Sequence, residues 1–334
     1  MIIAPERSRR PLGLASTKPH SRHDVERDDC PFCEGREDQS PPEVLAYREP
    51  GSATNGPGWS LRVVPNKYPA VGDYEFATTG KDLFFQSLPA FGRHEVVVEC
   101  PFHEANPAQF SLARIASIFR AYRDRMLDLA ADPWVAYVSA FKNVGAEAGA
   151  SLAHSHSQLI ALPLVPEAVQ EDWDNAQRYD SEHGHCVYCA MLERELREGV
   201  RIVLESPGFV VLAPYASRFA YELWVLPRTH ESCFESLTDE AALDLATLLK
   251  PLLGKLDAVL SAPAYNWYVR TGPLRSGRPP GFHWHLQLFP RTTRVAGFEW
   301  ATGCFINAVP PERAASELRS ARIEAAMSLA VDHG

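Results

Sequence analysis

Two short runs of histidine and glutamine are the part of this chain best suited to chemistry. The first is His154-Ser-His156-Ser-Gln158, and its spacing recurs in His283-Trp-His285-Leu-Gln287, 129 residues later (283 − 154 = 129). Alternate side chains of a strand point to one face, so the two imidazoles and the amide of each run are predicted to share a face. Such a row suits metal binding, nucleophilic attack and recognition of phosphate oxygens better than it suits core packing.

Two Cys-x-x-Cys pairs, one in each half of the chain, indicate metal sites. Zinc prefers four soft or borderline ligands in a tetrahedron, and a close thiol pair supplies two of them. Two histidines that follow apolar stretches complete each set, and neither set leaves an open position, so two structural zinc ions are predicted. The predicted ligands are Cys30, Cys33, His103 and His154 at the first site, and Cys186, Cys189, His230 and His283 at the second. His183 and His185 remain alternative ligands beside the second pair.

With His154 assigned to metal, His156 is the candidate nucleophile. A neutral imidazole attacks phosphorus and forms a phosphoramidate that is again easily displaced. Gln158 cannot take up a proton, but it can hydrogen-bond phosphate oxygens. Small residues before the run, including Gly149, leave room for backbone donors and the Ser151 hydroxyl to close around a phosphate. The predicted catalytic residues are therefore His156, Gln158 and Ser151.

The second run offers another possible nucleophile, His285. Phe282 and Trp284 crowd its approach, and no Gly-Ala-Ser stretch precedes it. A role for His285 in packing or as a further metal ligand is expected instead.

Composition excludes several function classes. The chain has 334 residues, 46% of them hydrophobic and 22% charged, which is enough for two ordinary domains. A formal net charge of −9 argues against a general nucleic-acid binder. No apolar run approaches the roughly 18 residues that span a bilayer, and the N-terminus lacks the pattern of an export signal. We expect a cytoplasmic protein with no nucleic-acid or membrane partner.

The repeated order of elements predicts an α+β fold, with antiparallel strands and one long crossover helix in each half. The expected domains are residues 1–165 and 166–334. Residues 1–29 resemble an extended arm, 36–60 a loop with little core, and 312–330 a terminal helix. Strands are expected at 61–64, 94–99, 134–140 and 158–162, and again at 209–213, 221–226, 266–270 and 286–289. The long helices are expected at 107–130, capped by Asn106, and at 238–260, with a possible bend at Pro251.

The first His-x-His-x-Gln run resembles the active-site motif of the galactose-1-phosphate uridylyltransferase branch of the histidine-triad superfamily, and the resemblance covers nearly the whole chain. It implies two tandem histidine-triad-like modules, of which the N-terminal one is catalytic and each carries a metal site. It also implies a homodimer. The implied chemistry is a double displacement, in which His156 takes the nucleotidyl group from a nucleotide sugar and passes it to a second phosphate.

Four further segments resemble substrate-binding parts of this family. They correspond to an N-terminal arm whose arginines reach the diphosphate, a nucleoside-pocket strand, a segment contacting ribose and phosphate, and a loop contributed to the neighbouring subunit's sugar site. With Gly149 from the small-residue stretch, the implied substrate-binding residues are Arg7, Arg10, Asn66, Asn143, Gly149, Gly297, Phe298 and Glu299.

Two activities within this branch compete. One exchanges uridylyl between UDP-glucose and galactose 1-phosphate, and the other, in the ADP-glucose phosphorylase group, moves adenylyl from ADP-glucose to inorganic phosphate. The Ser-His-Ser string, the second Cys2His2 set and the run from Gly297 to Asn307 resemble the second group, whereas His285 departs from it. Glu171 or Asp172 lies near the carboxylate position of the bacterial iron site, so a mixed second site holding iron is the alternative. A nucleotide hydrolase and a non-catalytic nucleotide-binding protein are the rival functions.

Overall fold

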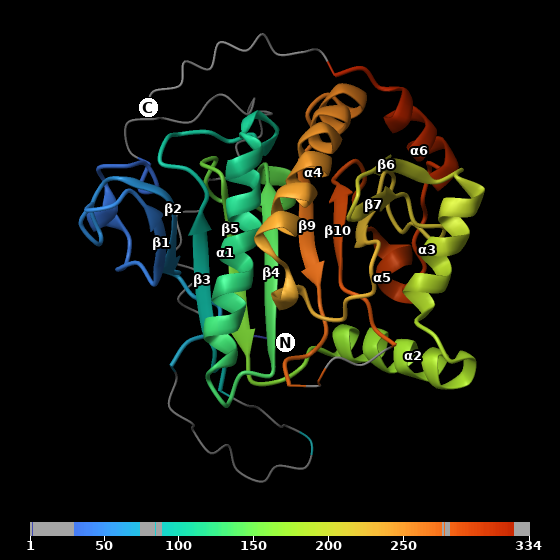
Figure 1. Cartoon of the computed structure of the whole chain (residues 1–334), viewed down its shortest axis with the longest axis horizontal. Coiled ribbons are helices and arrows are strands. Elements are labelled where there is room, and N and C mark those ends of the chain that lie inside the picture. Colours follow the sequence, from blue (N-terminus) through green and yellow to red (C-terminus); the bar gives the residue numbers. More distant parts are fainter. Residues whose placement is uncertain are drawn as a thin grey trace.

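A single antiparallel sheet of ten strands is the framework of the described part of the chain (Figure 1). The computed structural model describes residues 30–73, 89–275 and 281–323, together with residues 2, 84 and 277. The expected N-terminal arm, with Arg7 and Arg10, lies outside these residues, as does the end of the expected terminal helix beyond residue 323. Strands and helices are separate elements rather than alternating parallel units, in agreement with the predicted α+β class.

The strands follow the order β1-β2-β3-β5-β4-β9-β10-β8-β7-β6, so the two halves join edge to edge between β4 and β9. The first half supplies β1 (Leu45–Arg48), β2 (Trp59–Pro65), β3 (Arg93–Val98), β4 (Tyr137–Val144) and β5 (His156–Leu162). The second half supplies β6 (Ile202–Glu205), β7 (Phe209–Leu212), β8 (Leu223–Pro227), β9 (Tyr265–Arg270) and β10 (His285–Pro290).

Two long helices, α1 (Leu112–Ala130) and α4 (Asp239–Leu260), lie side by side across one face of the sheet (Figure 1). Ile115, Ile118, Phe119 and Tyr122 form the apolar face of α1 and are all buried in the main core. Trp267 of β9 packs near Phe119, so this core is shared by both halves. The remaining helices are α2 (Glu167–His183), α3 (Val187–Glu198), α5 (Gly297–Thr302) and α6 (Pro311–Ser320). No helix within the described ranges is long and apolar enough to cross a membrane.

The expected start of the first helix is wrong. Asn106 caps a short 3-10 turn, Pro107–Gln109, and the chain then becomes extended at Phe110, whose side chain is buried. Ser111 is the actual N-cap of α1, and its side chain accepts a hydrogen bond from the Arg114 N–H. The helix in the second half matches its predicted range closely: Thr238 caps it, and Pro251 lies inside it.

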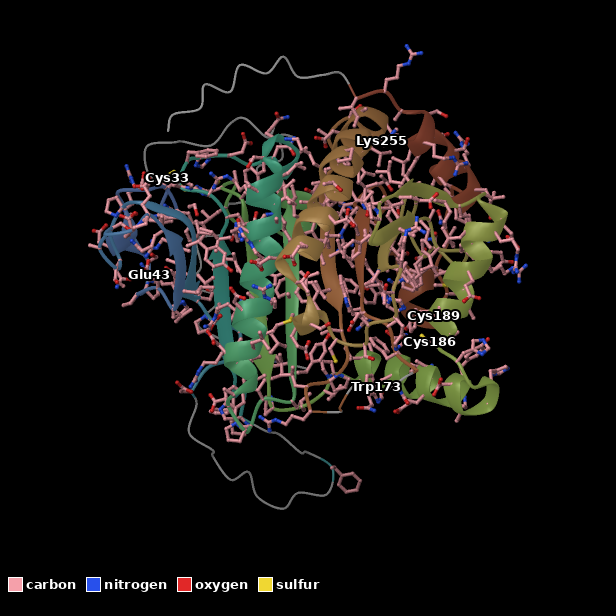
Figure 2. All side chains as sticks on the ribbon, viewed as in Figure 1. Cys33, Glu43, Trp173, Cys186, Cys189 and Lys255 are labelled. Atoms are coloured by element: carbon pink, nitrogen blue, oxygen red, sulfur yellow. The ribbon has the colours of Figure 1, made fainter. Side chains whose placement is uncertain are left out.

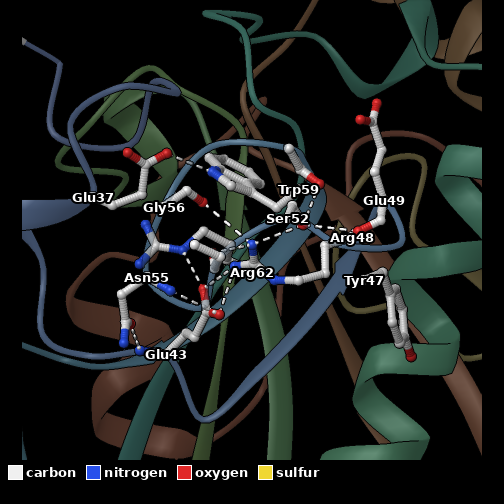
Figure 3. Close-up of polar contacts among 12 residues, drawn as sticks. Glu37, Glu43, Tyr47, Arg48, Glu49, Ser52, Asn55, Gly56, Trp59 and Arg62 are labelled. Atoms are coloured by element: carbon white, nitrogen blue, oxygen red, sulfur yellow. Dashed lines mark hydrogen bonds and ion pairs between the residues drawn. The ribbon is translucent and has the colours of Figure 1, made fainter.

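The expectation that residues 36–60 form a loop with little core is also wrong. This segment contains β1 and the first residues of β2, and Trp59 is buried. Glu43 holds the hairpin together, since it accepts hydrogen bonds from Arg48 (2.5 Å) and Arg62 (3.0 Å), as Figure 3 shows. Trp59 Nε1 donates to Glu37 at 2.7 Å. β2 is largely buried, but all four residues of β1 are only half-buried, so hydrophobic periodicity did not reveal β1.

The third expected strand of the first half is displaced. It was expected at 134–140, but β4 begins at Tyr137 and continues to Val144. Both Lys142 and Asn143 therefore lie within a strand and point to opposite faces of the sheet.

The two faces of the sheet have different surroundings. Leu61, Val97 and Leu159 belong to the core beneath α1 and α4. Val96 and Val98 instead form a small cluster on the opposite face, and their register partners in β5 are Gln158 and His156. The candidate catalytic side chains therefore lie on the face away from the long helices.

Candidate active site and metal centres

The first Cys2His2 set is brought together as predicted. The ligand atoms of Cys30, Cys33, His103 and His154 all lie within 4.8 Å of one another. His154 Nδ1 lies 3.4 Å from Cys30 Sγ and 3.6 Å from Cys33 Sγ, and His103 Nδ1 lies 3.7 Å from Cys33 Sγ. A zinc tetrahedron with bonds of about 2.0–2.3 Å has edges of roughly 3.3–3.8 Å. The donor types and their spacing therefore fit a metal ion such as zinc.

The tautomer of His154 also fits metal binding. Its Nε2 lies 2.9 Å from the Cys100 carbonyl oxygen, which can only accept, so Nε2 carries the proton. The lone pair on Nδ1 then faces the thiols, in the arrangement that second-shell carbonyls impose on metal-ligating histidines. Burial raises the pKa of Cys30 to about 11 and lowers the pKa of His154 to about 3. A bound cation would offset the first effect by stabilising the thiolate.

The second set, Cys186, Cys189, His230 and His283, is likewise brought together, with its ligand atoms within 4.8 Å of one another. Cys189 Sγ lies 3.3 Å from His230 Nδ1 and 3.5 Å from His283 Nδ1. Burial raises the pKa of Cys189 to about 12 and lowers the pKa of His283 to about 4. Figure 2 shows Cys186 and Cys189 in the second half, well apart from Cys33.

The alternative ligands do not join this second set. His183 and His185 are exposed, and each hydrogen-bonds a nearby backbone carbonyl through Nδ1. Asp172 forms an ion pair with Arg270 at 3.1 Å.

His156, the first residue of β5, is held in one tautomer. Its Nδ1 lies 2.8 Å from the His154 carbonyl oxygen and must donate to it, so the lone pair is on Nε2. Phe32, between the two cysteines of the first pair, contacts the His156 ring edge-on at 5.5 Å between centroids. The sequence interpretation missed Phe32, although an aromatic residue enclosed by two metal ligands was a visible signal. Metal binding by His154 and nucleophilic chemistry by His156 are compatible in this geometry.

Gln158 is oriented by His94, another residue that the sequence interpretation missed. The Ala70 N–H donates to His94 Nδ1 at 3.0 Å, so His94 Nε2 carries the proton and donates to Gln158 Oε1 at 2.9 Å. This hydrogen bond occupies the Gln158 oxygen, so the amide NH2 is the group with which Gln158 can donate. Asn66 Nδ2 lies 3.1 Å from His94 Nε2, which places this predicted nucleoside-binding residue in the same cluster.

The small-residue loop before β5 has the left-handed backbone that glycine favours. Gly145 and Gly149, with φ of +84° and +88°, flank the 3-10 turn Ala146–Ala148. A Cβ on Gly149 would meet nothing within 4 Å, so its backbone conformation rather than crowding requires glycine there. Ser151 follows in this loop, half-buried, and its catalytic role stays a prediction.

Asn143 receives a contact from the other half of the chain. Asn266 Nδ2, on β9, donates to Asn143 Oδ1 at 2.6 Å and to the Ala148 carbonyl at 2.9 Å. This bond occupies the Asn143 oxygen, so its NH2 is the group with which Asn143 can donate; its substrate-binding role stays a prediction. Its neighbour Lys142 points the other way, into the core, where it pairs with Glu99 at 2.5 Å.

The second His-x-His-x-Gln run is sealed. His285 Nδ1 donates to the His283 carbonyl at 3.1 Å, and its Nε2 accepts from Gln287 Nε2 at 2.8 Å. Trp224 stacks on the ring at 4.7 Å between centroids, and Tyr188 contacts it at 5.1 Å. His285 is buried and its pKa is lowered by desolvation to about 3. Of the two roles expected for His285, packing or a further metal ligand, the structure agrees with packing, because His285 is not part of the second set.

The predicted sugar-site residues lie elsewhere. Gly297, Phe298 and Glu299 begin α5, which lies among the elements of the second half, near α3 and away from β5 (Figure 1). Phe298 is 54% exposed. The structure does not bring these residues together with His156 of the same chain.

Comparison with known proteins gives consistent matches. The family model described as the galactose-1-phosphate uridyl transferase N-terminal domain matches residues 1–166, and the model of the C-terminal domain matches residues 172–299. The chain is 37% identical over 323 residues to ADP-glucose phosphorylase of Arabidopsis thaliana, covering 96% of this chain and 89% of that protein. It is 29% identical over 275 residues to galactose-1-phosphate uridylyltransferase of Thermotoga maritima, covering 80% and 86%.

Solved structures agree with these matches. The structure of an ADP-glucose phosphorylase from Arabidopsis thaliana with bound ADP-glucose superposes with a TM-score of 0.77 at 37% identity, covering 91% of this chain and 94% of that one. A structure of uridylyltransferase superposes with a TM-score of 0.77 at 27% identity, with the same coverage. The predicted fold class and family resemblance are confirmed.

Proposed function

The chain belongs to the galactose-1-phosphate uridylyltransferase family, and on this premise we propose that it transfers a nucleoside monophosphate through a covalent nucleotidyl-His156 intermediate. It is a nucleotidyltransferase. The proposed donor is a nucleotide sugar, UDP-glucose or ADP-glucose, and the acceptor is a hexose 1-phosphate or inorganic phosphate. The orientation of His156 carries the proposal, because its Nδ1–H is bound to the His154 carbonyl and its Nε2 bears the lone pair.

Two displacements make up the proposed reaction. His156 Nε2 attacks the α-phosphorus, a P–N bond forms, and the bond from that phosphorus to the bridging oxygen breaks, releasing the sugar phosphate. An acceptor phosphate oxygen then attacks the same phosphorus, and the P–N bond breaks to restore neutral His156. The His154 carbonyl stabilises the positive charge on the ring in the intermediate. The Gln158 NH2 donates to a non-bridging oxygen, and Ser151, Gly149, Asn143 and Asn66 are the further proposed contacts.

The two Cys2His2 sets are proposed to hold zinc in a structural role, with iron as the alternative at the second. An ion at the first set would fix the turn before His156, and neither ion would take part in bond making. Residues 1–165 are the proposed catalytic domain and 166–334 the second one. We further propose a cytoplasmic homodimer in which Phe298 and Glu299 reach the sugar site of the other subunit, and in which Arg7 and Arg10 reach the diphosphate.

Intact-protein mass spectrometry after short incubations with UDP-glucose and, separately, with ADP-glucose tests the proposal. The wild-type protein is expected to gain the mass of one nucleotidyl group from at least one donor. His156→Ala should gain none, whereas the matched variant His285→Gln should label like the wild type because that ring is sealed by Gln287 and Trp224.

Labelling that persists in His156→Ala, or no labelling from either donor by protein with both metal sites filled, would contradict the proposed intermediate. Release of free nucleotide in the absence of an acceptor phosphate would favour a hydrolase instead.

A further inference from the structure

A fully buried polar cluster lies behind the candidate nucleophile, and the proposed reaction does not use it. Lys142 Nζ donates to Glu99 Oε2 at 2.5 Å and to Ser155 Oγ at 2.9 Å, and Ser155 Oγ donates to the same carboxylate oxygen at 2.6 Å. The exposed fractions of Glu99, Lys142 and Ser155 are 0%, 1% and 4%. We call these three residues the Glu99 cluster.

The cluster occupies the face of the sheet opposite the His156 ring. Lys142 pairs in register with Ser157, whose side chain points away from those of His156 and Gln158. The Nζ of Lys142 lies 5.5 Å from the centre of the Trp267 ring in the shared core. No side chain of the Glu99 cluster can therefore reach a substrate bound at His156.

What the cluster does contact is the backbone around His156. Lys142 Nζ donates to the His156 carbonyl at 3.1 Å, and the Glu99 N–H donates to the Ser155 carbonyl at 3.3 Å. The Ser155 N–H in turn donates to the Glu104 carbonyl at 2.8 Å. The three peptide groups that follow His154, Ser155 and His156 are thus each held by a hydrogen bond, two of them by main-chain groups and the third by the Lys142 side chain. These peptide groups set the direction of the His154 carbonyl that fixes the His156 ring.

Stability does not account for the cluster. Burying an ion pair has a desolvation cost that its attraction often fails to exceed, and apolar replacement of similar volume is frequently neutral or stabilising. Glu99 adds to this cost, because its Oε1 is buried without a hydrogen-bond partner among the described residues.

The second half of the chain supplies an internal comparison. Trp224 of β8 is the register partner of Gln287, just as Val96 of β3 is the register partner of Gln158. Three residues further along the chain in each case, Pro227 is therefore the counterpart of Glu99. Val269 faces Leu286 as Lys142 faces Ser157, and Trp284 stands between its two histidines as Ser155 does. The three counterparts Pro227, Val269 and Trp284 are apolar and buried. The same fold is therefore built without the ion pair in the half whose histidine is sealed.

We propose that Glu99, Lys142 and Ser155 are positioning residues, which hold the His154–His156 backbone so that His156 Nε2 is aligned for attack on phosphorus. This inference rests on the proposed function of His156. The cluster contributes orientation from behind the sheet rather than contact with the substrate. A displacement of about 1 Å at a reacting group costs roughly 100-fold in rate, so even a small relaxation of this backbone should be measurable.

The test is the double variant Glu99→Leu/Lys142→Met, which removes both charges together and leaves no unpaired ion. Its matched control is Glu95→Leu/Arg125→Met, because Glu95 of β3 and Arg125 of α1 form another buried ion pair on the core face (2.7 Å and 2.8 Å), and no hydrogen bond among the described residues joins either side chain to the His154–His156 segment. The rate of nucleotidyl-His156 formation is measured by quenched-flow mass spectrometry across donor concentrations, alongside metal content and thermal unfolding.

We expect the Glu99→Leu/Lys142→Met variant to form the adduct about 10- to 100-fold more slowly at saturating donor. Its half-saturating donor concentration should change less than twofold, and its metal content should equal that of the wild type. The control variant should keep the wild-type rate. If the double variant does not fold, Ser155→Ala provides the second test: it keeps the ion pair, removes the hydroxyl between its members, and should slow adduct formation about 3- to 10-fold.

A wild-type rate in these variants, or an equal loss of rate in the Glu95→Leu/Arg125→Met control, would overturn the inference while leaving the proposed function intact. A wild-type protein that forms no adduct with either donor would overturn both.

Discussion

At the scale of single residues, the chain contains two histidines with the same spacing and the same Nδ1 hydrogen bond but different roles: His156 is the proposed nucleophile, and His285 is a packing residue. His156 and His285 each donate to the carbonyl of the histidine two residues before. The two runs differ in the glutamine that follows. Gln287 donates through its amide to Nε2 of His285, whereas Gln158 accepts through Oε1 from His94. Residue types and spacing led to the eight metal ligands, which the structure brings together in two sets. They also led to His156 and Gln158 as catalytic residues, and that role stays a prediction. The sequence did not predict His94, Phe32 or Glu99, which act only through neighbours that the fold supplies.

Replacing His94 by Phe should slow adduct formation about 10-fold. Without the hydrogen bond from His94 Nε2, the Gln158 amide can rotate and no longer presents its NH2 reliably to the phosphate. Losing one preorganised donor entirely costs about 100-fold or more, so Gln158→Ala should be slower still. Single-turnover kinetics of the two variants gives the comparison, and an unchanged rate in His94→Phe beside a slow Gln158→Ala would show that His94 does not orient the amide.

At the scale of elements, each Cys2His2 set joins segments that are distant in sequence. The first connects the turn before β1, the loop after β3 and the position two residues before β5. The second connects the beginning of α3 with the loops after β8 and before β10. Strands with clear apolar alternation were predicted to within a few residues. The helices α2 and α3 were not, because α2 buries only Val169 and Ala176 and so shows no apolar period.

Removing metal from the two sites separately should have different consequences. Cys33→Ser is expected to abolish adduct formation and lower thermal stability, because the first set includes His154 and its carbonyl orients His156. Cys189→Ser should lower stability, while protein that remains folded should still form the adduct. Metal analysis, thermal unfolding and adduct formation are measured for both, and a fully active Cys33→Ser protein lacking metal would contradict the expectation.

The N-cap of α1 offers a prediction about stability alone. Ser111→Ala removes the side chain that accepts from the Arg114 N–H and should lower the free energy of unfolding by about 1 kcal/mol. Urea denaturation measures the loss. Adduct formation should be unaffected, and a change in its rate larger than twofold would mean that α1 is coupled to the site in a way these contacts do not explain.

At the scale of the whole molecule, the two halves are not independent. They share one sheet through the β4–β9 pairing and one core beneath α1 and α4. Asn266 of the second half reaches Asn143 of the first, so the candidate site contains a contact that residues 1–165 alone cannot supply. The sequence predicted the duplication but not this junction, because pairing between β4 and β9 joins residues more than a hundred positions apart.

Asn266→Ala should therefore impair a reaction whose nucleophile is in the other half. Loss of its hydrogen bonds to Asn143 and Ala148 should raise the half-saturating donor concentration about 5- to 10-fold, in line with about 1–1.5 kcal/mol for a hydrogen bond. Asn307→Ala is the control, since the Asn307 NH2 also donates two hydrogen bonds, in its case to the backbone carbonyls of Ser217 and Phe219. Equal effects in both variants would indicate general destabilisation.

The sealed ring of His285 also determines how much label one chain can carry. Two copies of the motif could suggest two labelled histidines per chain. However, His285 is buried, Trp224 and Tyr188 contact its ring, and Gln287 donates to its Nε2. Titration with a radiolabelled donor should thus saturate at a single equivalent per chain, and the size of the initial burst becomes a direct count of competent protein.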